Sequence, residues 1–313
     1  MNGRSAKGAS LPAMSSPAAT VRGSEGGARP CRGFIRGRRQ PRDMALSLDA
    51  TQLDRYSRHI IMDEVGPEGQ GRLLSSRVVV VGAGGLGAPA IQYLAAVGVG
   101  ELVVVDDDVV ERSNLQRQVV HRDDDVGTPK AESAAAFVRG LNPDVSVEPV
   151  EARVDKSNVH EIVAGADVVV DASDNFPTRY LLNDVCRFEE IPLVHGAIYK
   201  FEGQATTLVP DGPCYRCLFP EAPEPGTVPD CATTGVLGVL PGTVGCIQAT
   251  EAMKLLLDEG EVLDGRLMFY DAMDMTFETV PYRKTPDCPV CGEGGVDSIE
   301  DIDYVESCAI SLD

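Results

Sequence analysis

The chain has 313 residues, of which 43% are hydrophobic, enough for the core of one large α/β domain or two modest ones. It contains no apolar run of about 18 residues, and its N-terminus lacks the apolar segment of about 7–15 residues that a secretory signal requires. These features predict a globular cytoplasmic protein and exclude a membrane-spanning one.

The net charge of −20 is unevenly distributed. Residues 1–43 carry nine Lys and Arg and two Asp and Glu. The rest of the chain therefore has 19 Lys and Arg and 46 Asp and Glu, a net charge of −27. Such an acidic surface suits a cytoplasm salty enough to shorten the Debye length to roughly 3 Å, although an ordinary acidic enzyme is also compatible with it. Direct nucleic-acid binding is disfavoured, because it needs a basic face.

The first 43 residues are rich in Gly, Ala, Ser, Pro and Arg and lack apolar periodicity, which predicts a disordered basic leader. Patterned sequence begins with 44-MALSLDATQLDRYSRHI-60. We interpret the leader as inert or as the product of a mis-chosen start codon, and binding to an acidic partner is the alternative. The folded domain is expected over residues 44–292, with an acidic tail at 293–313.

The first predicted elements include one βαβ unit. An amphipathic helix is expected over residues 51–62, a strand over 77–81, a helix over 85–97 and a second strand over 101–105. Because such crossovers are right-handed, the two strands are expected to be parallel.

The same alternation continues through the middle of the chain. Thr128 is expected to cap a helix that has Pro129 in its first turn and ends near Leu141. Strands follow at 145–150, 168–172 and 193–197, with a helix at 179–188.

The pattern changes after Tyr199, where 203-GQATTLV-209 and 266-RLMFYDAMDMTFETV-280 predict antiparallel strands and residues 243–257 a helix. The expected fold class is therefore α/β: a Rossmann-like, mostly parallel sheet with helices on both faces, continued by antiparallel strands.

The stretch 78-VVVVGAGGLGAPA-90 predicts a nucleotide-binding turn. Gly82, Gly84 and Gly87 fit the fingerprint that lets a backbone turn tightly against a pyrophosphate. Asp106, about 20 residues further on, is placed to hold ribose hydroxyls. These features suit a nicotinamide dinucleotide as well as ATP, so an NAD-dependent oxidoreductase is one alternative.

The residues that follow favour ATP. Arg117 and Lys130, beside a helix N-terminus, would form a polyphosphate clamp that stabilises charge moving from an α-phosphate to a departing pyrophosphate. Asp174, at the carboxyl end of a predicted strand, is placed to hold Mg²⁺. The catalytic His or Tyr and Lys arrangement of an oxidoreductase is not evident in the sequence.

Four of the nine cysteines form the pairs 214-CYRC-217 and 288-CPVC-291. Cys214, Cys217, Cys288 and Cys291 would satisfy tetrahedral Zn²⁺ with no open position, which indicates a structural site. A redox role for one pair is the alternative. Cys186 and Cys246 fall in apolar helices and are expected to be small core residues.

Cys231 lies in the stretch 220-PEAPEPGTVPDCATTGVLG-238, where four prolines and three glycines predict a long loop. Long loops within a domain are usually functional, and a thiol on one can approach a substrate for covalent transfer. A cysteine without a role is the alternative.

Six features together indicate a family: 55-RYSRHI-60, 82-GAGGLG-87, 113-SNLQRQ-118, 129-PK-130, 171-DASDN-175 and the two CxxC pairs. Over residues 53–292 the chain resembles the MoeB/ThiF/HesA family, the prokaryotic relatives of ubiquitin-activating enzymes. It looks most similar to the haloarchaeal members that activate small archaeal modifier proteins.

The resemblance implies that ATP and Mg²⁺ are bound by Gly85, Asp106, Ser113, Asn114, Leu115, Gln116, Arg117, Lys130, Asp174 and Asn175. It implies a symmetric homodimer in which Arg58 reaches the neighbouring nucleotide site, whereas the pattern alone places Arg58 on a helix surface. It makes Cys231, in a crossover loop at 218–238, the candidate nucleophile, and it supports a shared zinc ion.

The predicted function is ATP-dependent adenylation of the C-terminal glycine of a small β-grasp protein that ends in Gly-Gly, a ubiquitin-like modifier or sulfur carrier. A thioester on Cys231 or a thiocarboxylate would follow, for protein conjugation, tRNA thiolation or molybdopterin sulfuration. Only about twenty residues follow the second CxxC pair, so a sulfur donor would be a separate protein. A non-catalytic scaffold of the same fold is the remaining alternative.

Overall fold

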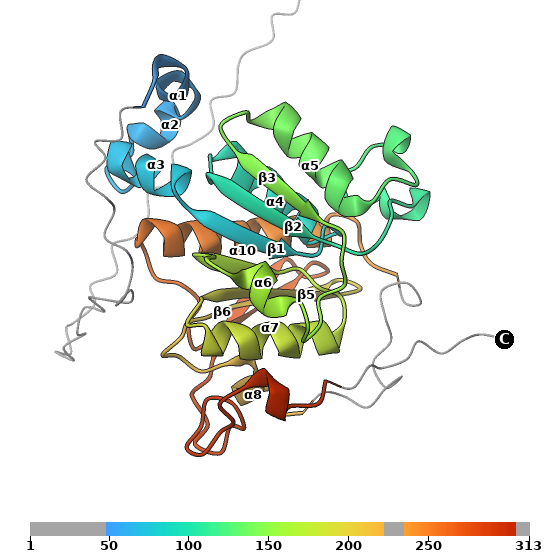
Figure 1. Cartoon of the computed structure of the whole chain (residues 1–313), viewed down its shortest axis with the longest axis vertical. Coiled ribbons are helices and arrows are strands. Elements are labelled where there is room, and N and C mark those ends of the chain that lie inside the picture. The colour runs from blue at the N-terminus through green and yellow to red at the C-terminus, as the bar shows by residue number, and fades with distance from the viewer. Residues whose placement is uncertain (1–47, 222–234, 305–313) are drawn as a thin grey trace, which may run out of the picture. The chain divides into compact units, whose positions relative to one another are not determined.

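The computed structural model describes residues 48–221 and 235–304. Within them, eight strands form one sheet in the order β3-β2-β1-β4-β5-β6-β7-β8 (Figure 1). The strands are β1 (Arg77–Val81), β2 (Glu101–Val105), β3 (Ser146–Val150), β4 (Val168–Asp171), β5 (Leu193–Tyr199), β6 (Glu202–Leu208), β7 (Arg266–Asp271) and β8 (Thr276–Pro281).

The α-helices of the described residues are α1 (Ala50–Arg55), α2 (Ser57–Ile60), α3 (Gly66–Leu74), α4 (Gly87–Ala96), α5 (Lys130–Leu141), α6 (Val159–Val163), α7 (Phe176–Phe188), α8 (Tyr215–Leu218) and α10 (Leu240–Leu257). Three short 3-10 turns are η1 (Arg112–Asn114), η2 (Asp123–Asp125) and η3 (Ile299–Asp301). None of the helices in the described part is long and apolar enough to cross a membrane.

Two hydrophobic layers enclose the sheet. Neighbouring strands from β3 to β5 pair in parallel, and those from β5 to β8 pair antiparallel, which confirms the predicted fold class. Successive side chains of a strand point to opposite faces. Val78 and Val80 therefore pack with α3, α4, α5 and α10, whereas Val79 and Val81 pack with α6 and α7.

The strand order fixes where ligands can bind. From β1 the chain proceeds to β2 and β3 on one side and later to β4 and β5 on the other, so the order reverses beside β1. Val81 pairs with both Val105 and Asp171, which brings the carboxyl ends of β1, β2 and β4 together. Open α/β sheets bind ligands at such a point.

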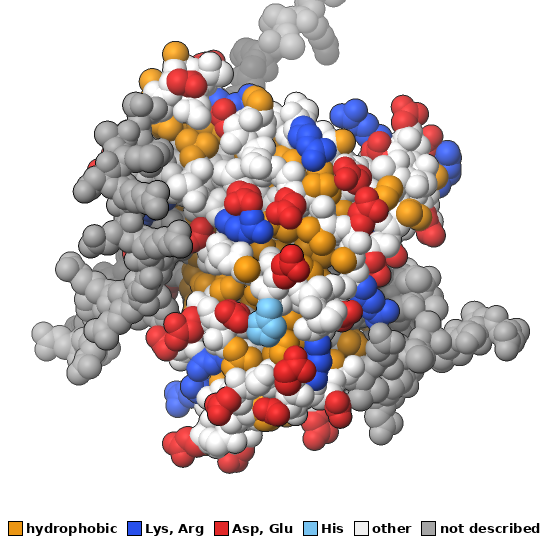
Figure 2. All heavy atoms as spheres, viewed as in Figure 1, with side chains coloured by type: hydrophobic (Ala, Val, Ile, Leu, Met, Phe, Trp, Pro, Cys, Tyr) orange, Lys and Arg blue, Asp and Glu red, His pale blue; other side chains and the backbone are white. Residues whose placement is uncertain are grey.

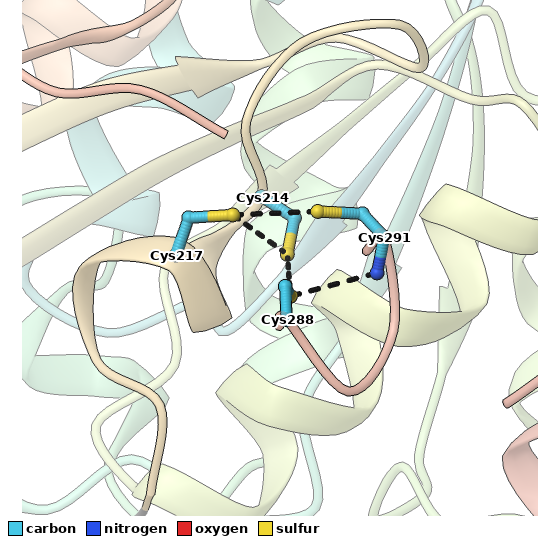
Figure 3. Close-up of side chains that lie close together, drawn as sticks. All are labelled: Cys214, Cys217, Cys288 and Cys291. Atoms are coloured by element: carbon cyan, nitrogen blue, oxygen red, sulfur yellow. Dashed lines mark hydrogen bonds between the residues drawn. The ribbon is translucent and has the colours of Figure 1, made fainter. Parts of the chain in front are cut away.

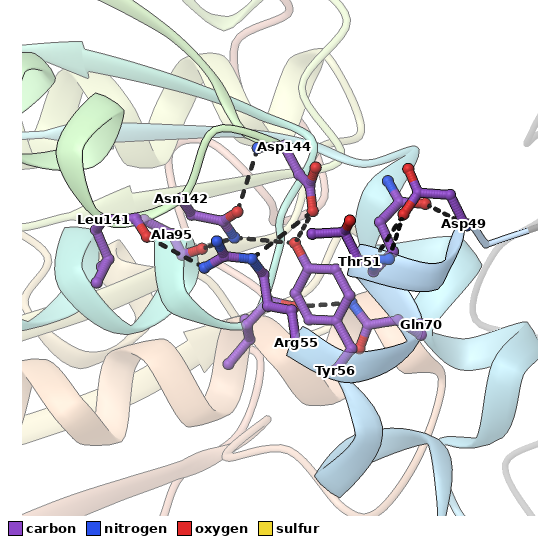
Figure 4. Close-up of polar contacts among 11 residues, drawn as sticks. Asp49, Thr51, Arg55, Tyr56, Gln70, Ala95, Leu141, Asn142 and Asp144 are labelled. Carbon is purple, nitrogen blue, oxygen red and sulfur yellow. Dashed lines mark hydrogen bonds and ion pairs between the residues drawn. The ribbon is translucent and has the colours of Figure 1, made fainter.

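The N-terminal helix expected over residues 51–62 is instead two short helices that break at Tyr56 (Figure 4). The Tyr56 hydroxyl donates to Asp144 Oδ2 at 3.0 Å and accepts from Asn142 Nδ2 at 2.9 Å. Asn142 also donates to the Ala95 carbonyl at 2.7 Å. Burial raises the pKa of Tyr56 to about 12, so the hydroxyl remains a donor at neutral pH and anchors α1 and α2 to the body.

Other predicted details are also corrected. Thr128 does not cap α5. The N-cap is Pro129, and no side chain caps the helix. The first backbone amide of the helix, Lys130 N, donates instead to the Asp108 carbonyl at 2.9 Å. Cys186 is buried as predicted, but Cys246 is only partly buried. Helices α3 and α6 were not expected from the sequence.

Candidate functional site

A pocket of about 420 Å³ lies where the carboxyl ends of β1, β2 and β4 meet. It brings together Gly82, Gly84, Gly85, Asp106, Arg117, Lys130, Asp174 and Asn175, eight of the residues that the sequence indicated. Their elements are far apart in the chain, so the fold assembles one polar site from them.

The glycine loop between β1 and α4 requires glycine at two positions. Gly82 has a φ of +99°, and a Cβ there would lie 2.6 Å from the Ala172 carbonyl oxygen. A Cβ on Gly87 would overlap the Gly82 carbonyl oxygen at 1.8 Å. No side chain caps α4, whose preceding residues Gly84 and Gly85 line the pocket. The positive end of the α4 dipole is therefore available to an anion.

Asp106 follows β2 and is held by the backbone. Its Oδ2 accepts from Ala83 N at 2.8 Å and its Oδ1 from Asp108 N at 2.9 Å. Burial raises the pKa of Asp106, and the Lys130 ammonium opposes that shift. In a nucleotide-binding sheet, a carboxylate at this position hydrogen-bonds the ribose hydroxyls.

Two cations line the pocket beside the glycine loop. Lys130 is buried, with its Nζ 2.7 Å from Asp108 Oδ2, while the Asp108 side chain itself is 67% exposed. Arg117 is half-buried, and its Nη1 donates to the Ser113 carbonyl at 3.3 Å. Both side chains can present positive charge to phosphate oxygens.

The four residues before Arg117 are not among those that line the pocket. Within this turn, Ser113 Oγ donates to the Glu111 carboxylate at 3.1 Å, and Asn114 Oδ1 accepts from Glu111 N at 3.1 Å. Leu115 is half-buried and Gln116 is exposed. The turn contacts Arg117 through the Ser113 carbonyl, and nucleotide binding by Ser113, Asn114, Leu115 and Gln116 stays a prediction.

On the other side of β1, Asp174 is exposed and lines the pocket directly after β4. Asn175 is the N-cap of α7, where its Oδ1 accepts from Thr178 N at 3.0 Å. Pro177 lies in the first turn of α7 and restricts its backbone. Because the Asp174 side chain is exposed, its carboxylate is open to a cation.

Sequence reasoning missed Arg179 and Gln118, which also line the pocket and are buried. We expected a helix beginning at Arg179, whereas α7 starts three residues earlier. The Asn-Phe-Pro order of the cap was a readable signal, and it would have placed Arg179 in the first turn beside the pocket.

Of the other predicted catalytic residues, one lies away from the pocket and one falls outside the described part of the chain. Arg58 is exposed on α2 and does not line the pocket, so a nucleotide contact by Arg58 would require a second copy of the chain and stays a prediction. Cys231 falls outside the described residues.

The four cysteines of the two CxxC pairs converge (Figure 3). Their sulfur atoms all lie within 4.8 Å of one another, with 3.5 Å between Cys214 and Cys288 and 3.3 Å between Cys217 and Cys291. Tetrahedral zinc with bonds of about 2.3 Å places its sulfurs about 3.8 Å apart, so this cluster fits the ion. Four thiols occupy every position of such a site.

The surface is mixed rather than basic on the face shown in Figure 2. Acidic side chains lie over much of that face, with Lys and Arg side chains and apolar areas between them. This face therefore offers no continuous basic area for a nucleic-acid backbone.

Comparison with known proteins gives a consistent picture. The model of the ThiF family matches residues 56–290. The "SAMP-activating enzyme E1" of Haloferax volcanii is 97% identical over 270 residues, which cover 86% of this chain and 100% of that protein. The "Sulfur carrier protein adenylyltransferase" of Thermus thermophilus is 52% identical and covers 83% of this chain and 97% of that protein.

Solved structures share the fold. The crystal structure of E. coli MccB with ATP has a TM-score of 0.64 and 24% identity, and the match covers 72% of this chain and 69% of MccB. A crystal structure of PaaA has a TM-score of 0.66 and 22% identity over 79% of this chain and 78% of PaaA.

Proposed function

We propose that this chain, which belongs to the ThiF family, adenylates the C-terminal glycine of a ubiquitin-like modifier or sulfur-carrier protein with ATP. The family, the fold class and the enzyme class predicted from the sequence are confirmed by the comparisons. They do not favour an NAD-dependent oxidoreductase or a non-catalytic scaffold.

One observation supports the proposal most strongly: Asp106, Lys130, Arg117 and Asp174 surround a single pocket beside the N-terminus of α4. The ribose would lie against Asp106 and the triphosphate over the glycine loop. Asp174 would hold Mg²⁺, which would neutralise charge on the phosphate oxygens.

The reaction joins a carboxylate to phosphorus. An oxygen of the substrate's C-terminal carboxylate forms a bond to the α-phosphorus of ATP. The bond from that phosphorus to the oxygen bridging the β-phosphate breaks, and pyrophosphate leaves with the electron pair, so the products are an acyl-adenylate and pyrophosphate. A carboxylate is already ionised at neutral pH, so no general base is needed. Arg117 and Lys130 would stabilise the charge that moves onto the pyrophosphate.

The cysteine cluster has a structural part in the proposal. Zn²⁺ held by Cys214, Cys217, Cys288 and Cys291 would tie the segment after β8 to the segment that contains α8. The site offers no open position for a substrate, so the ion would contribute to folding rather than to the chemical step.

Later steps also belong to the proposal. Cys231 would accept the acyl group as a thioester, with loss of AMP, or assist formation of a thiocarboxylate with sulfur from a separate donor protein. The active form would be a cytoplasmic homodimer in which Arg58 of each protomer serves the other's pocket. The acidic composition fits a salt-adapted cytoplasm.

Exchange of radiolabelled pyrophosphate into ATP tests the adenylation step, with a purified β-grasp protein ending in Gly-Gly as the acceptor. Asp174→Asn is expected to lower the exchange rate about 10²- to 10³-fold, as loss of a group that stabilises transition-state charge does. Asp124→Asn, on the exposed turn η2, is the matched control and should exchange at the wild-type rate. Undiminished exchange in Asp174→Asn, or binding of NAD⁺ in preference to MgATP, would contradict the proposal.

A Cys231→Ala variant separates the two stages. It is expected to retain exchange while losing the thioester, detected as a thiol-sensitive adduct of enzyme and acceptor on a non-reducing gel. Normal transfer by this variant would remove the covalent role of Cys231 and leave the adenylation step unaffected.

A further inference from the structure

Arg179 is a buried cation in the pocket that the adenylation chemistry has not used. It is 8% exposed and lines the pocket together with Asp174. Its Nη2 donates to the Ser173 carbonyl at 3.3 Å, and its guanidinium lies over the Phe176 ring at 5.1 Å. The Nε atom is buried and has no hydrogen-bond partner among the described residues.

Arg179 forms a long ion pair with the buried carboxylate of Asp171. Arg179 Nε is 3.9 Å from Asp171 Oδ2, beyond hydrogen-bond distance. Asp171 is fully buried and accepts instead from His195 Nδ1 at 2.7 Å and from Ser173 N at 3.0 Å. The guanidinium therefore retains capacity for a second carboxylate, the group that its planar fork matches best.

The orientation of Arg179 is fixed from the far side by Tyr215. The Tyr215 side chain lies beside Arg179, and its ring packs edge-on against His195 at 4.8 Å and Tyr180 at 5.2 Å. Asn183 Oδ1 accepts from Tyr215 N at 2.7 Å. Because Tyr215 follows Cys214 directly, the cysteine cluster and the pocket share one packed segment.

Arg179 lies on α7, whose preceding strand β4 is on the opposite side of β1 from β2 and the proposed ribose site. Asp106 follows β2, the glycine loop follows β1, and Arg179 projects from α7, which follows β4. Beyond it, Ala197 and Ile198 of β5 also line the pocket, toward the antiparallel strands. A nucleotide with its ribose at Asp106 and its phosphates at α4 leaves the Arg179 side of the pocket for the second reactant.

We propose that Arg179 binds the C-terminal carboxylate of the protein substrate and orients it toward the α-phosphate of ATP. This inference rests on the proposed function and adds the residue that recognises the reacting group. Two nitrogens of the Arg179 guanidinium would hold the substrate carboxylate before the reaction. The carboxylate oxygen that attacks the α-phosphorus would then already be positioned within the pocket.

A binding cycle tests the contact without any chemical step. The probe is a β-grasp protein ending in Gly-Gly, prepared with a free C-terminal carboxylate and with a C-terminal amide. Its dissociation constant is measured by calorimetry in the presence of magnesium and an ATP analogue with a methylene α,β bridge. Wild-type enzyme is expected to bind the amide about 10- to 100-fold more weakly, the range of one charge-assisted bidentate pair.

Arg179→Gln is expected to weaken binding of the carboxylate probe by the same factor and to leave binding of the amide probe unchanged. Its affinity for the nucleotide analogue alone should stay within about twofold of wild type. Arg139→Gln, an exposed position on α5 outside the pocket, is the matched control for loss of one positive charge. Equal binding of the two probes by wild-type enzyme, or a selective loss of nucleotide affinity in Arg179→Gln, would overturn the inference.

Two further variants keep the test decisive if Arg179→Gln does not fold. Arg179→Lys keeps the charge but not the fork and should lose part of the preference for the carboxylate. Tyr215→Phe keeps the ring packing but removes the hydroxyl beside Arg179, and it should weaken carboxylate binding about threefold to tenfold without affecting the amide. Wild-type preference in both variants would contradict the inference.

The outcomes also separate this inference from the function on which it rests. If wild-type enzyme supports pyrophosphate exchange with the free probe but binds the amide equally well, only the role of Arg179 fails. If neither probe binds and no exchange occurs, the proposed function fails.

Discussion

The pocket and the cysteine cluster differ in how their functional groups are held. Asp106, Lys130 and Asp174 come from separate loops and helix ends, and all three line one open pocket. The cluster sulfurs lie against one another, and three of its four residues are at most 6% exposed. We therefore expect changes in the pocket to act mainly on ligand binding, and changes in the cluster to act mainly on the stability of the chain.

The largest effect on stability is expected from the cluster. Cys288→Ser should remove one zinc ligand, cost several kcal/mol and lower the thermal midpoint by about 10 °C or more. Elemental analysis should find about one zinc per wild-type chain and less in the variant. Cys246→Ser, a partly buried cysteine of α10, is the control and should melt within about 2 °C of wild type. Equal thermal midpoints for Cys288→Ser and Cys246→Ser would contradict a structural role for the cysteine cluster.

The pocket should show the opposite behaviour when Lys130 is changed to Met, which keeps the length of the side chain. Affinity for MgATP is expected to fall about 10- to 100-fold, because one charge-assisted contact to phosphate is lost. The thermal midpoint of the free protein should change little, since the partner Asp108 is mostly exposed. Calorimetry with MgATP measures the affinity, and Lys156→Met, at a partly exposed position outside the pocket, serves as a control. A large fall in the midpoint with unchanged affinity would assign Lys130 a structural role instead.

A smaller change is expected at the anchor of the N-terminal helices. Tyr56→Phe removes the hydroxyl that contacts Asp144 and Asn142 and should cost about 1–2 kcal/mol, or roughly 3–6 °C in the thermal midpoint. The intrinsic affinity for MgATP should persist, because Tyr56 does not line the pocket. Thermal melting and calorimetry of the same preparation check both statements, and a midpoint equal to that of wild type would refute the anchoring role.

The smallest effect concerns the pH dependence of stability at Asp106. Its pKa in the folded protein is raised by burial, so the folded state binds a proton more tightly than the unfolded chain. The stability that Asp106 contributes is therefore greatest below its unfolded pKa and is lost as pH rises through its folded pKa. The midpoint of Asp106→Asn relative to wild type should increase between about pH 4 and pH 7.

Thermal melts of both proteins across that range, at constant salt, measure the difference. A difference for Asp106→Asn that is flat or falls with pH would show that burial does not govern this carboxylate.

Several features of the fold followed directly from the sequence. The valine runs of β1, β2 and β4 are buried on both faces, as the interior strands of a parallel sheet must be, and their continuous apolar pattern predicted them. The glycines at 82 and 87 were equally readable, because only glycine fits the contacts of that turn.

Other features depended on contacts between distant segments. Helix α3 has glycine or proline at four of its nine positions, yet it forms because Gly69, Gln70 and Leu73 pack against the body. Its sequence is unfavourable in isolation, and tertiary burial overrides that propensity.

The sequence by itself determined which groups to expect at the two sites, because a glycine turn, a carboxylate after a strand and a CxxC pair each follow from local backbone or ligand geometry. Only the tertiary structure decided that Arg179 shares the pocket with Asp174, and that the sulfur atoms of the two predicted cysteine pairs come within contact distance. Side-chain proximity across a sheet or between distant segments depends on where whole elements pack, and local sequence patterns do not encode that distance.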